Sequence, residues 1–325
     1  MPNKNLVDIK ENDIIKYDSQ LLPILLKDNS SKQNIIWATD NYVSYGDGYN
    51  GSDSITTSSI TGKKGNIIKP RVNKKKTEQL SRVRDRAEVF TPSWICNKQN
   101  NLVDNAWFGA EEVFNTESHN GWEALLRPVP FPTREGKGWQ DYVKDVRLEV
   151  SCGEAPYLVS RYDTITGEPI EVAQRIGLLD RKLRVVSENT TTIEDWSEWA
   201  TIAFKSTYGF EWQGDNLLLA RENLLFTFID YYKCKFSNTP SIESLREIAR
   251  IISWNLWQMD GLKGVIPNSC GSHKITTYNL FGEVEVSVQL CDGCSKNNIH
   301  QHNGIYCKIK DWQTGGTLKF VSLLK

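Results

Sequence analysis

The sequence has almost no net charge and no long uninterrupted hydrophobic run. Lys and Arg number 39 against 40 Asp and Glu, a net charge of −1 over 325 residues. This balance excludes a globally basic nucleic-acid coat but leaves room for local basic patches. The most apolar stretch, residues 217–229, is interrupted by Arg221, Glu222 and Asn223, and the N-terminus lacks the apolar core of a signal peptide. We therefore expect no membrane span, no signal peptide and a cytoplasmic protein.

A disulfide framework and internal repeats are also missing. The cysteines number seven, an odd count in a chain without a secretion signal. Because disulfides persist mainly in oxidising compartments, we expect reduced thiols. No segment recurs at a fixed period.

The distribution of residue types predicts three parts. Residues 1–83 are expected to form a helical N-terminal extension and a basic linker, 84–265 an α/β core, and 266–325 a Cys- and His-rich module with C-terminal strands. Apolar residues at 6–27 recur at helical spacing, with Pro23 between two short helical pieces.

A basic segment extends from Lys63 to Arg86, with ten basic residues against only Glu78 and Asp85. Basic side chains on one face can neutralise nucleic-acid phosphates. The alternative is a solvated linker ahead of a domain. The candidate phosphate contacts are Lys74, Lys75, Lys76, Arg82 and Arg84.

The middle of the chain alternates strand-like and helix-like segments. Residues 147–152 and 205–212 are β-rich, 215–232 form an amphipathic helix, and 246–261 form a helix that continues into a strand. Strands that alternate with helices indicate parallel βαβ units, so we expect an α/β fold with a parallel sheet.

Small and acidic residues lie at the ends of these strands, where ligands bind in such sheets. Glu149 lies within the first strand and Gly153 directly after it, and Glu211 ends the second. We expect Glu211 to hold a ribose and Asp260, at the end of the third strand, to meet an adenine amino group. Trp212 adds an aromatic ring that can stack on a ligand.

Four segments occur in a characteristic order: VFTPSWICN at 89–97, LEVSCGEAPYLVSRYD at 148–163, YGFEWQGDNLLLARENLL at 208–225 and ISWNLWQMDGL at 252–262. Together they resemble the amino-methylating DNA methyltransferases, especially the modification subunits of bacterial restriction systems. The resemblance covers roughly residues 84–265.

The resemblance implies a class I Rossmann-like core that binds S-adenosylmethionine and methylates the adenine amino group of double-stranded DNA. It also implies a restriction-modification or phage-defence system, with a specificity or restriction subunit as partner. Carried over by position, it implies cofactor contacts from Phe90, Thr91, Pro92, Glu149, Gly153, Glu211, Met259 and Asp260.

The chain departs from this family in two places. The turn CGEAPY has one glycine where the family has several small residues, so we expect a tighter or differently shaped pocket. The family's Asn/Asp-Pro-Pro-aromatic tetrapeptide, which holds the target amino group and stacks on the extruded base, is absent from the sequence. Its closest local substitute is Asp311 with Trp312. An alternative function is therefore a catalytically incomplete cofactor- and DNA-binding subunit.

Cysteines and histidines cluster near the C-terminus. Cys270 is followed by the CDGC knuckle of Cys291 and Cys294 and then by Cys307. Converging thiolates favour tetrahedral zinc, and a site with four protein ligands is structural. We predict an all-cysteine zinc site, in which a histidine from HQH at 300–302 could replace one thiolate. The alternative is a fortuitous group of free thiols.

Overall fold

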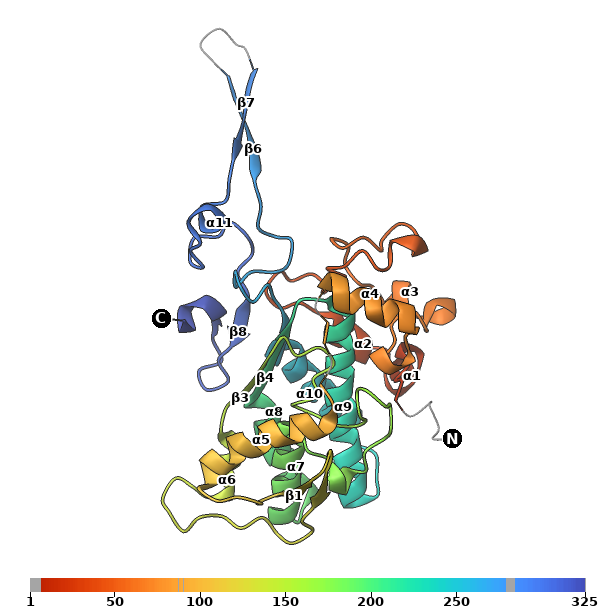
Figure 1. Cartoon of the computed structure of the whole chain (residues 1–325), viewed down its shortest axis with the longest axis vertical. Helices are drawn as coiled ribbons and strands as arrows, with labels where there is room; N and C mark the ends of the chain where they lie inside the picture. The colour runs from red at the N-terminus through yellow and green to blue at the C-terminus, as the bar shows by residue number, and fades with distance from the viewer. Residues whose placement is uncertain (1–6, 87, 90, 279–283, 325) are drawn as a thin grey trace.

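The computed structural model describes residues 7–86, 88–89, 91–278 and 284–324. Its helices and strands form a mixed α/β body, from which one two-stranded hairpin projects (Figure 1). No helix within the described ranges has the length and apolar character that crossing a membrane requires.

A parallel sheet of three strands lies within this body. They are, in spatial order, β3 (Arg147–Val150), β4 (Thr207–Glu211) and β5 (Leu256–Gln258). Gly209 of β4 lies opposite Glu149 on one side and Leu256 on the other. The carboxyl ends of the strands therefore meet at one edge of the sheet, and the three predicted strands and their parallel direction are confirmed.

Two helices connect each pair of neighbouring strands. α7 (Leu178–Asn189) and α8 (Ile193–Lys205) follow β3, and α9 (Gly214–Phe236) and α10 (Ile242–Asn255) follow β4. α8 and α10 begin at Thr192 and Ser241, whose hydroxyl oxygens accept hydrogen bonds from backbone N–H groups of the first turn. α9 is buried along most of its length, as its long apolar runs predict.

The N-terminal segment contains short helices. They are α1 (Glu11–Tyr17), α2 (Leu21–Leu26), α3 (Thr57–Ile60) and α4 (Lys76–Arg86), with 3₁₀ turns at Val43–Tyr45, Gly62–Lys64 and Arg71–Asn73. The break between the first two helices precedes Pro23, which lies in the first turn of α2. A proline is tolerated there because the first N–H groups of a helix have no intrahelical acceptor.

Arg221 of α9 joins this segment to the sheet. Its guanidinium is fully buried and donates to the carbonyl oxygens of Leu25 and Lys27 at the end of α2. The same group donates to the carbonyl oxygens of Ser253 and Leu256, where α10 passes into β5. The N-terminal segment therefore shares one hydrophobic core with α7, α8, α9 and α10.

The remaining elements come before or after the strands of the parallel sheet along the chain. Before it come α5 (Ser93–Phe108), the antiparallel hairpin of β1 (Asn115–Ser118) and β2 (Gly121–Ala124), and α6 (Trp139–Lys144); a 3₁₀ turn at Val172–Gln174 precedes α7. After it come β6 (His273–Tyr278) and β7 (Val284–Gln289), α11 (Asp292–Lys296), β8 (Lys308–Lys310), β9 (Thr317–Lys319) and a 3₁₀ turn at Phe320–Leu323. β6 and β7 form the projecting hairpin (Figure 1).

Candidate functional site

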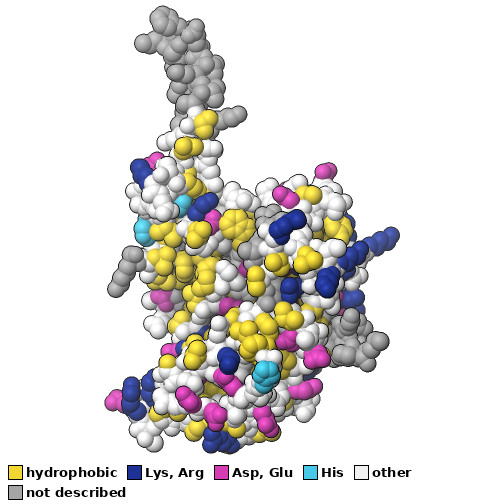
Figure 2. All heavy atoms as spheres, viewed as in Figure 1, with side chains coloured by type: hydrophobic (Ala, Val, Ile, Leu, Met, Phe, Trp, Pro, Cys, Tyr) yellow, Lys and Arg dark blue, Asp and Glu magenta, His cyan; other side chains and the backbone are white. Residues whose placement is uncertain are grey.

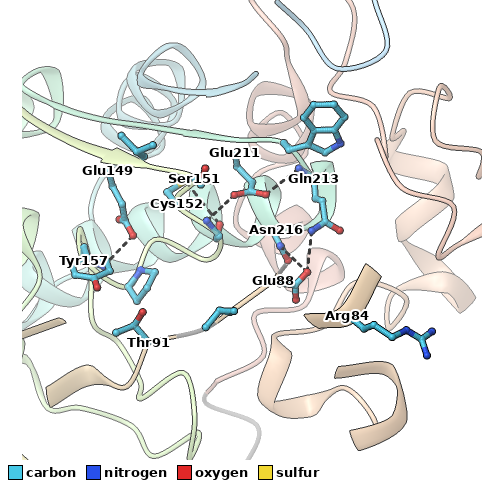
Figure 3. Close-up of a pocket in the computed structure, with 15 residues that line it drawn as sticks. Arg84, Glu88, Thr91, Glu149, Ser151, Cys152, Tyr157, Glu211, Gln213 and Asn216 are labelled. Atoms are coloured by element: carbon cyan, nitrogen blue, oxygen red, sulfur yellow. Dashed lines mark hydrogen bonds between the residues drawn. The ribbon is translucent and has the colours of Figure 1, made fainter. Parts of the chain in front are cut away.

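A cavity of about 760 Å³ opens at the carboxyl ends of β3 and β4. This is the edge of a parallel sheet at which ligands bind, and the volume lies in the range of small-molecule pockets. Figure 3 shows side chains from both strand ends and from the segment before α5 around it. The lining consists of Arg84, Glu88, Val89, Thr91, Glu149, Val150, Ser151, Cys152, Gly153, Pro156, Tyr157, Glu211, Trp212, Gln213 and Asn216.

The turn after β3 forms one wall of the cavity in an unusual backbone conformation. Ser151, Gly153 and Ala155 have φ angles of 51°, 54° and 64°. Only glycine adopts this left-handed region without strain, and other residues there cost roughly 1–2 kcal/mol each. Gly153 adopts this conformation freely, whereas Ser151 and Ala155 carry its strain. Such strain persists where the surrounding structure enforces it, often at functional sites.

Two buried glutamates converge on this turn from adjacent strands. Glu211 accepts hydrogen bonds from the N–H groups of Gly153 at 2.9 Å and Gln213 at 3.1 Å. Glu149 accepts them from Tyr157 at 3.4 Å and Leu158 at 3.1 Å. A carboxylate offers about four acceptor sites, so each side chain is fixed by the backbone and keeps acceptor capacity for a ligand.

Burial disfavours the negatively charged form of both glutamates. Loss of solvation, together with repulsion from the nearby Glu211 carboxylate, raises the pKa of Glu149 to about 8, although the hydrogen bonds from Tyr157 and Leu158 act in the opposite direction. Burial likewise raises the pKa of Glu211 to about 7, with repulsion from Asp215 and Glu88 adding to the effect. A ligand with a positive charge or with hydroxyl donors would relieve this desolvation.

A second wall of the cavity escaped the sequence analysis. Glu88 accepts hydrogen bonds from the side-chain amides of Gln213, at 3.0 Å, and Asn216, at 3.2 Å. All three side chains line the cavity (Figure 3). Glu88 lies just before the VFTPSWICN segment, and Gln213 and Asn216 follow Glu211. Their closeness in sequence to these motifs was the signal that could have identified them as cavity residues.

The structure brings most of the predicted cofactor residues, but not all, to this cavity. Thr91, Glu149, Gly153, Glu211 and Trp212 line it, and the Trp212 indole N–H is tied to the carbonyl oxygen of Ala38 at 3.1 Å. Pro92 instead caps the start of α5, and Phe90 lies outside the described residues.

Met259 and Asp260 follow β5 and are not among the residues that line the cavity, although the Met259 N–H donates to the backbone carbonyl oxygen of Glu211 at 3.0 Å. Met259 is buried beside Trp257, which donates its indole N–H to the Met259 sulfur. Asp260 accepts the N–H of Leu262 and pairs with Lys263 at 3.4 Å. Within the described chain neither residue lines the cavity, so their predicted adenine contacts find no geometric support.

Two of the predicted phosphate contacts are internal ion pairs, which corrects that assignment. Lys74 and Arg82 are buried and pair with Asp215 at 3.5 and 2.8 Å, and Arg82 also pairs with Glu88 at 2.7 Å. Although burial alone would raise the pKa of Asp215, the charges of Arg82 and Lys74 lower it below its ordinary value. Lys75, Lys76 and Arg84 are exposed, and Arg84 lies at the cavity.

The predicted catalytic pair lies at the other end of the sheet, where the strands begin. Asp311 is in the turn between β8 and β9, where its carboxylate accepts from Thr314. Trp312 donates its indole N–H to Asn255 at 2.8 Å. Both line a separate groove that includes Val146 and Ser206, the residues at the amino ends of β3 and β4. Asp311 and Trp312 are thus not placed to act at the cavity.

A metal-ligand cluster lies at the base of the projecting hairpin. The sulfur atoms of Cys270, Cys291 and Cys294 and the Nδ1 atom of His302 all lie within 4.8 Å of one another. Where two of these four atoms are in contact, the distance between them is 3.2 to 3.7 Å. A tetrahedron with zinc–sulfur bonds of about 2.3 Å has edges of about 3.8 Å. The cluster could therefore hold a metal ion with four protein ligands.

Cys307 lies outside this cluster, and His302, from the histidine alternative, occupies the fourth position. The Cys307 side chain is fully buried against Phe210, Trp257 and Met259, and its thiol contacts the Gln258 carbonyl oxygen at 3.2 Å. Spacing alone could not distinguish it from His302, since both follow the CDGC knuckle.

The glycine of the knuckle is required by close approach. A Cβ atom at Gly293 would lie 2.6 Å from both the backbone nitrogen and the Nδ1 atom of His302. Any side chain there would push the histidine from the cluster.

Comparisons with known proteins add no family to this geometry. A scan against models of protein families matched none. Searches of curated proteins and of solved structures also found no match.

Proposed function

We propose that the chain is an S-adenosylmethionine-dependent DNA methyltransferase directed at the adenine amino group, in a restriction-modification or phage-defence system of the cytoplasm. The observation that carries the proposal is the convergence of Thr91, Glu149, Gly153, Glu211 and Trp212 on one cavity. These residues come from three segments of the sequence that resemble this family, and the parallel order of β3, β4 and β5 is compatible with a Rossmann-like sheet.

The chemistry of the cavity fits such a cofactor. S-adenosylmethionine supplies a methyl group on a positively charged sulfur, and it also carries an ammonium group and ribose hydroxyls. Glu211 has acceptor sites left for two hydroxyls, and Glu149 has them for an ammonium. The Oε1 atom of Gln213 is buried and lacks a hydrogen-bond partner in the described chain, so it can accept from a ligand.

Duplex DNA is the proposed macromolecular partner. Lys75 and Lys76 are exposed at the start of α4, and Arg84 on the same helix reaches the cavity. Phosphates held by these cations would bring a nucleotide close to the proposed cofactor site. A structural zinc ion in the cluster of Cys270, Cys291, Cys294 and His302 would rigidify the base of the hairpin.

A catalytically incomplete subunit is the second candidate. It is favoured by the position of Asp311 and Trp312, which are the closest substitute for the missing tetrapeptide and lie at the edge of the sheet away from the cavity. Such a subunit would bind cofactor and DNA and would need a specificity or restriction subunit, or another partner, to transfer a methyl group.

Glu211→Gln is expected to weaken S-adenosylmethionine binding by about tenfold or more, because the variant loses a charge-assisted hydrogen bond to the ligand. The amide keeps the size of the side chain but removes its charge. Because burial raises the pKa of Glu211 to about 7, the wild-type affinity should increase as the pH rises through this value. Isothermal titration calorimetry across that pH range measures both effects.

The matched control is Glu123→Gln, which changes an exposed glutamate on β2. It should bind the cofactor as the wild type does. Equal affinities of Glu211→Gln and the wild type would remove the cofactor assignment, and an equal pH dependence in both proteins would exclude Glu211 as its source.

A methyl-transfer assay separates the two candidate functions. The methyltransferase is expected to move labelled methyl groups from S-adenosylmethionine to mixed-sequence duplex DNA without other proteins. The incomplete subunit is expected to transfer them only when lysate of the native host is added. Asp311→Ala should not change the rate, since Asp311 is remote from the cavity. Label on RNA but not on DNA would refute the proposed substrate.

A further inference from the structure

β3 is an outer strand of the parallel sheet, and the apolar side chains on one of its faces are exposed. Within the described ranges β3 pairs with β4 alone, so one row of its backbone groups faces away from the sheet. Along the strand Arg147 and Glu149 are buried, whereas Leu148 and Val150 are 43% and 63% exposed. Parallel sheets normally have both faces covered and no exposed apolar edge, because such an edge invites pairing with another chain.

An apolar groove continues this edge toward the C-terminal strands. It has a volume of about 440 Å³ and begins at Val146, which is 65% exposed. Tyr208 of β4, Leu318 of β9 and Leu323 line it further along. Figure 2 shows hydrophobic side chains gathered below the projecting hairpin, on the side where Figure 1 places β3 and β8. The edge of β3 and this groove together form the edge surface, defined by Val146, Leu148, Val150, Tyr208, Leu318 and Leu323.

The charged residues of the groove are mostly of one sign. Lys144, Lys205 and Lys310 line it, against Asp311 as the acidic member. Lys144 and Lys205 precede β3 and β4, so the positive charge lies at the amino ends of the strands. An apolar strand with acidic residues at one end would complement both the apolar and the charged parts of the edge surface.

We propose that the edge surface binds an extended segment of a partner protein, which adds as a strand parallel to β3 and carries acidic residues at its amino-terminal end. Both strand pairs of this sheet are parallel, and a parallel addition brings that acidic end to Lys144 and Lys205. Its carboxyl end would reach the edge of the sheet where the cavity opens. The inference rests on the edge surface and not on the identity of the ligand in the cavity.

A second copy of this chain fits the edge surface poorly. Two copies related by a twofold axis would pair their β3 strands in the antiparallel direction. This pairing would bring the residues after β3 of one copy, Ser151, Cys152 and Gly153, to Lys144 of the other, so no exposed acidic group would meet the lysines. The occupant is therefore a different polypeptide.

A labelled synthetic peptide tests the proposal on the full chain. The probe has two acidic residues at its amino end, followed by alternating valine and threonine. We expect it to bind, as measured by fluorescence anisotropy, and to protect the backbone amides of Leu148 and Val150 from hydrogen exchange. A peptide with lysines in place of the acidic residues, and one with proline at its centre, should bind about tenfold more weakly or not at all.

Variants of the chain identify the surface that is used. Leu148→Lys changes an exposed side chain that does not line the cavity, so the fold should survive while binding of the acidic probe falls by about tenfold. Lys144→Glu should reverse the preference toward the lysine peptide, an effect that general loss of structure cannot produce. Lys63→Glu, on an exposed lysine of the N-terminal segment, is the matched control and should bind as the wild type does.

Three results would overturn the proposal. One is the absence of amide protection at Leu148 and Val150 with saturating probe. Another is equal or stronger binding of a peptide whose acidic residues are at the carboxyl end. The third is a dimer of the chain alone, seen by sedimentation, in which these amides are already protected.

Discussion

Asp215→Ala is expected to lower the free energy of unfolding by about 3–5 kcal/mol, the cost of leaving a buried charge without its partner. The Asp215 carboxylate is completely buried, pairs with Lys74 and Arg82, and accepts the Tyr42 hydroxyl at 2.7 Å. Arg82 would still have Glu88, whereas Lys74 would lose its ion-pair partner. Urea unfolding, followed by tryptophan fluorescence, measures the difference.

Lys75→Ala is the control for this variant, because Lys75 is adjacent in sequence to Lys74 but exposed. Its unfolding free energy should stay within about 0.5 kcal/mol of the wild type. Were Asp215→Ala as stable as the wild type, the buried ion pairs would not hold α4 in place. Lys74 and Arg82 would then return to the candidate DNA contacts.

Loss of one metal ligand is expected to release the metal and unfold the C-terminal module. Structural zinc contributes about 10–16 kcal/mol of apparent binding free energy in small zinc-dependent modules, and this energy stabilises the fold. We therefore expect the purified wild type to carry one zinc ion at this cluster, and His302→Ala and Cys294→Ser to lose it. Elemental analysis of the purified proteins measures zinc, and proteolysis reports the unfolding of residues 270–307.

Cys307→Ala separates the two possible ligand sets. Cys307 is packed against Phe210 and Trp257, so its loss should leave a cavity but retain the metal. Zinc retained in His302→Ala and lost in Cys307→Ala would restore the all-cysteine site. A wild-type protein with far less than one equivalent of zinc would leave the cluster as free thiols.

The parts of the fold that follow from local patterns were predictable. β3 and β4 are short β-rich segments, and α9 is a long run of helix-forming residues without proline. A parallel sheet aligns the carboxyl ends of its strands, so the meeting of Glu149, Gly153 and Glu211 at one edge also followed from the sequence. The knuckle with Cys291 and Cys294 was evident from its spacing.

The parts that depend on distant partners were not predictable. Lys74 and Arg82 belong to a basic segment that suggested a surface, and their partner Asp215 lies more than a hundred residues later. Asp311 and Trp312 follow β8, but the sequence does not tell which end of the main sheet that strand approaches. His302 and not Cys307 completes the cluster, because the chain after the knuckle passes the cluster again at His302 before Cys307 enters the core.

The bonds of Arg221 constrain the order in which the chain can fold during synthesis. Its guanidinium satisfies carbonyl oxygens at Leu25 and Lys27 and, at the same time, those at Ser253 and Leu256. Domains fold as units when their chain is complete enough to bury its polar groups. The first helices of this protein thus leave the ribosome long before Arg221 and β5 are synthesised. They can take their final positions only after β5 has been made.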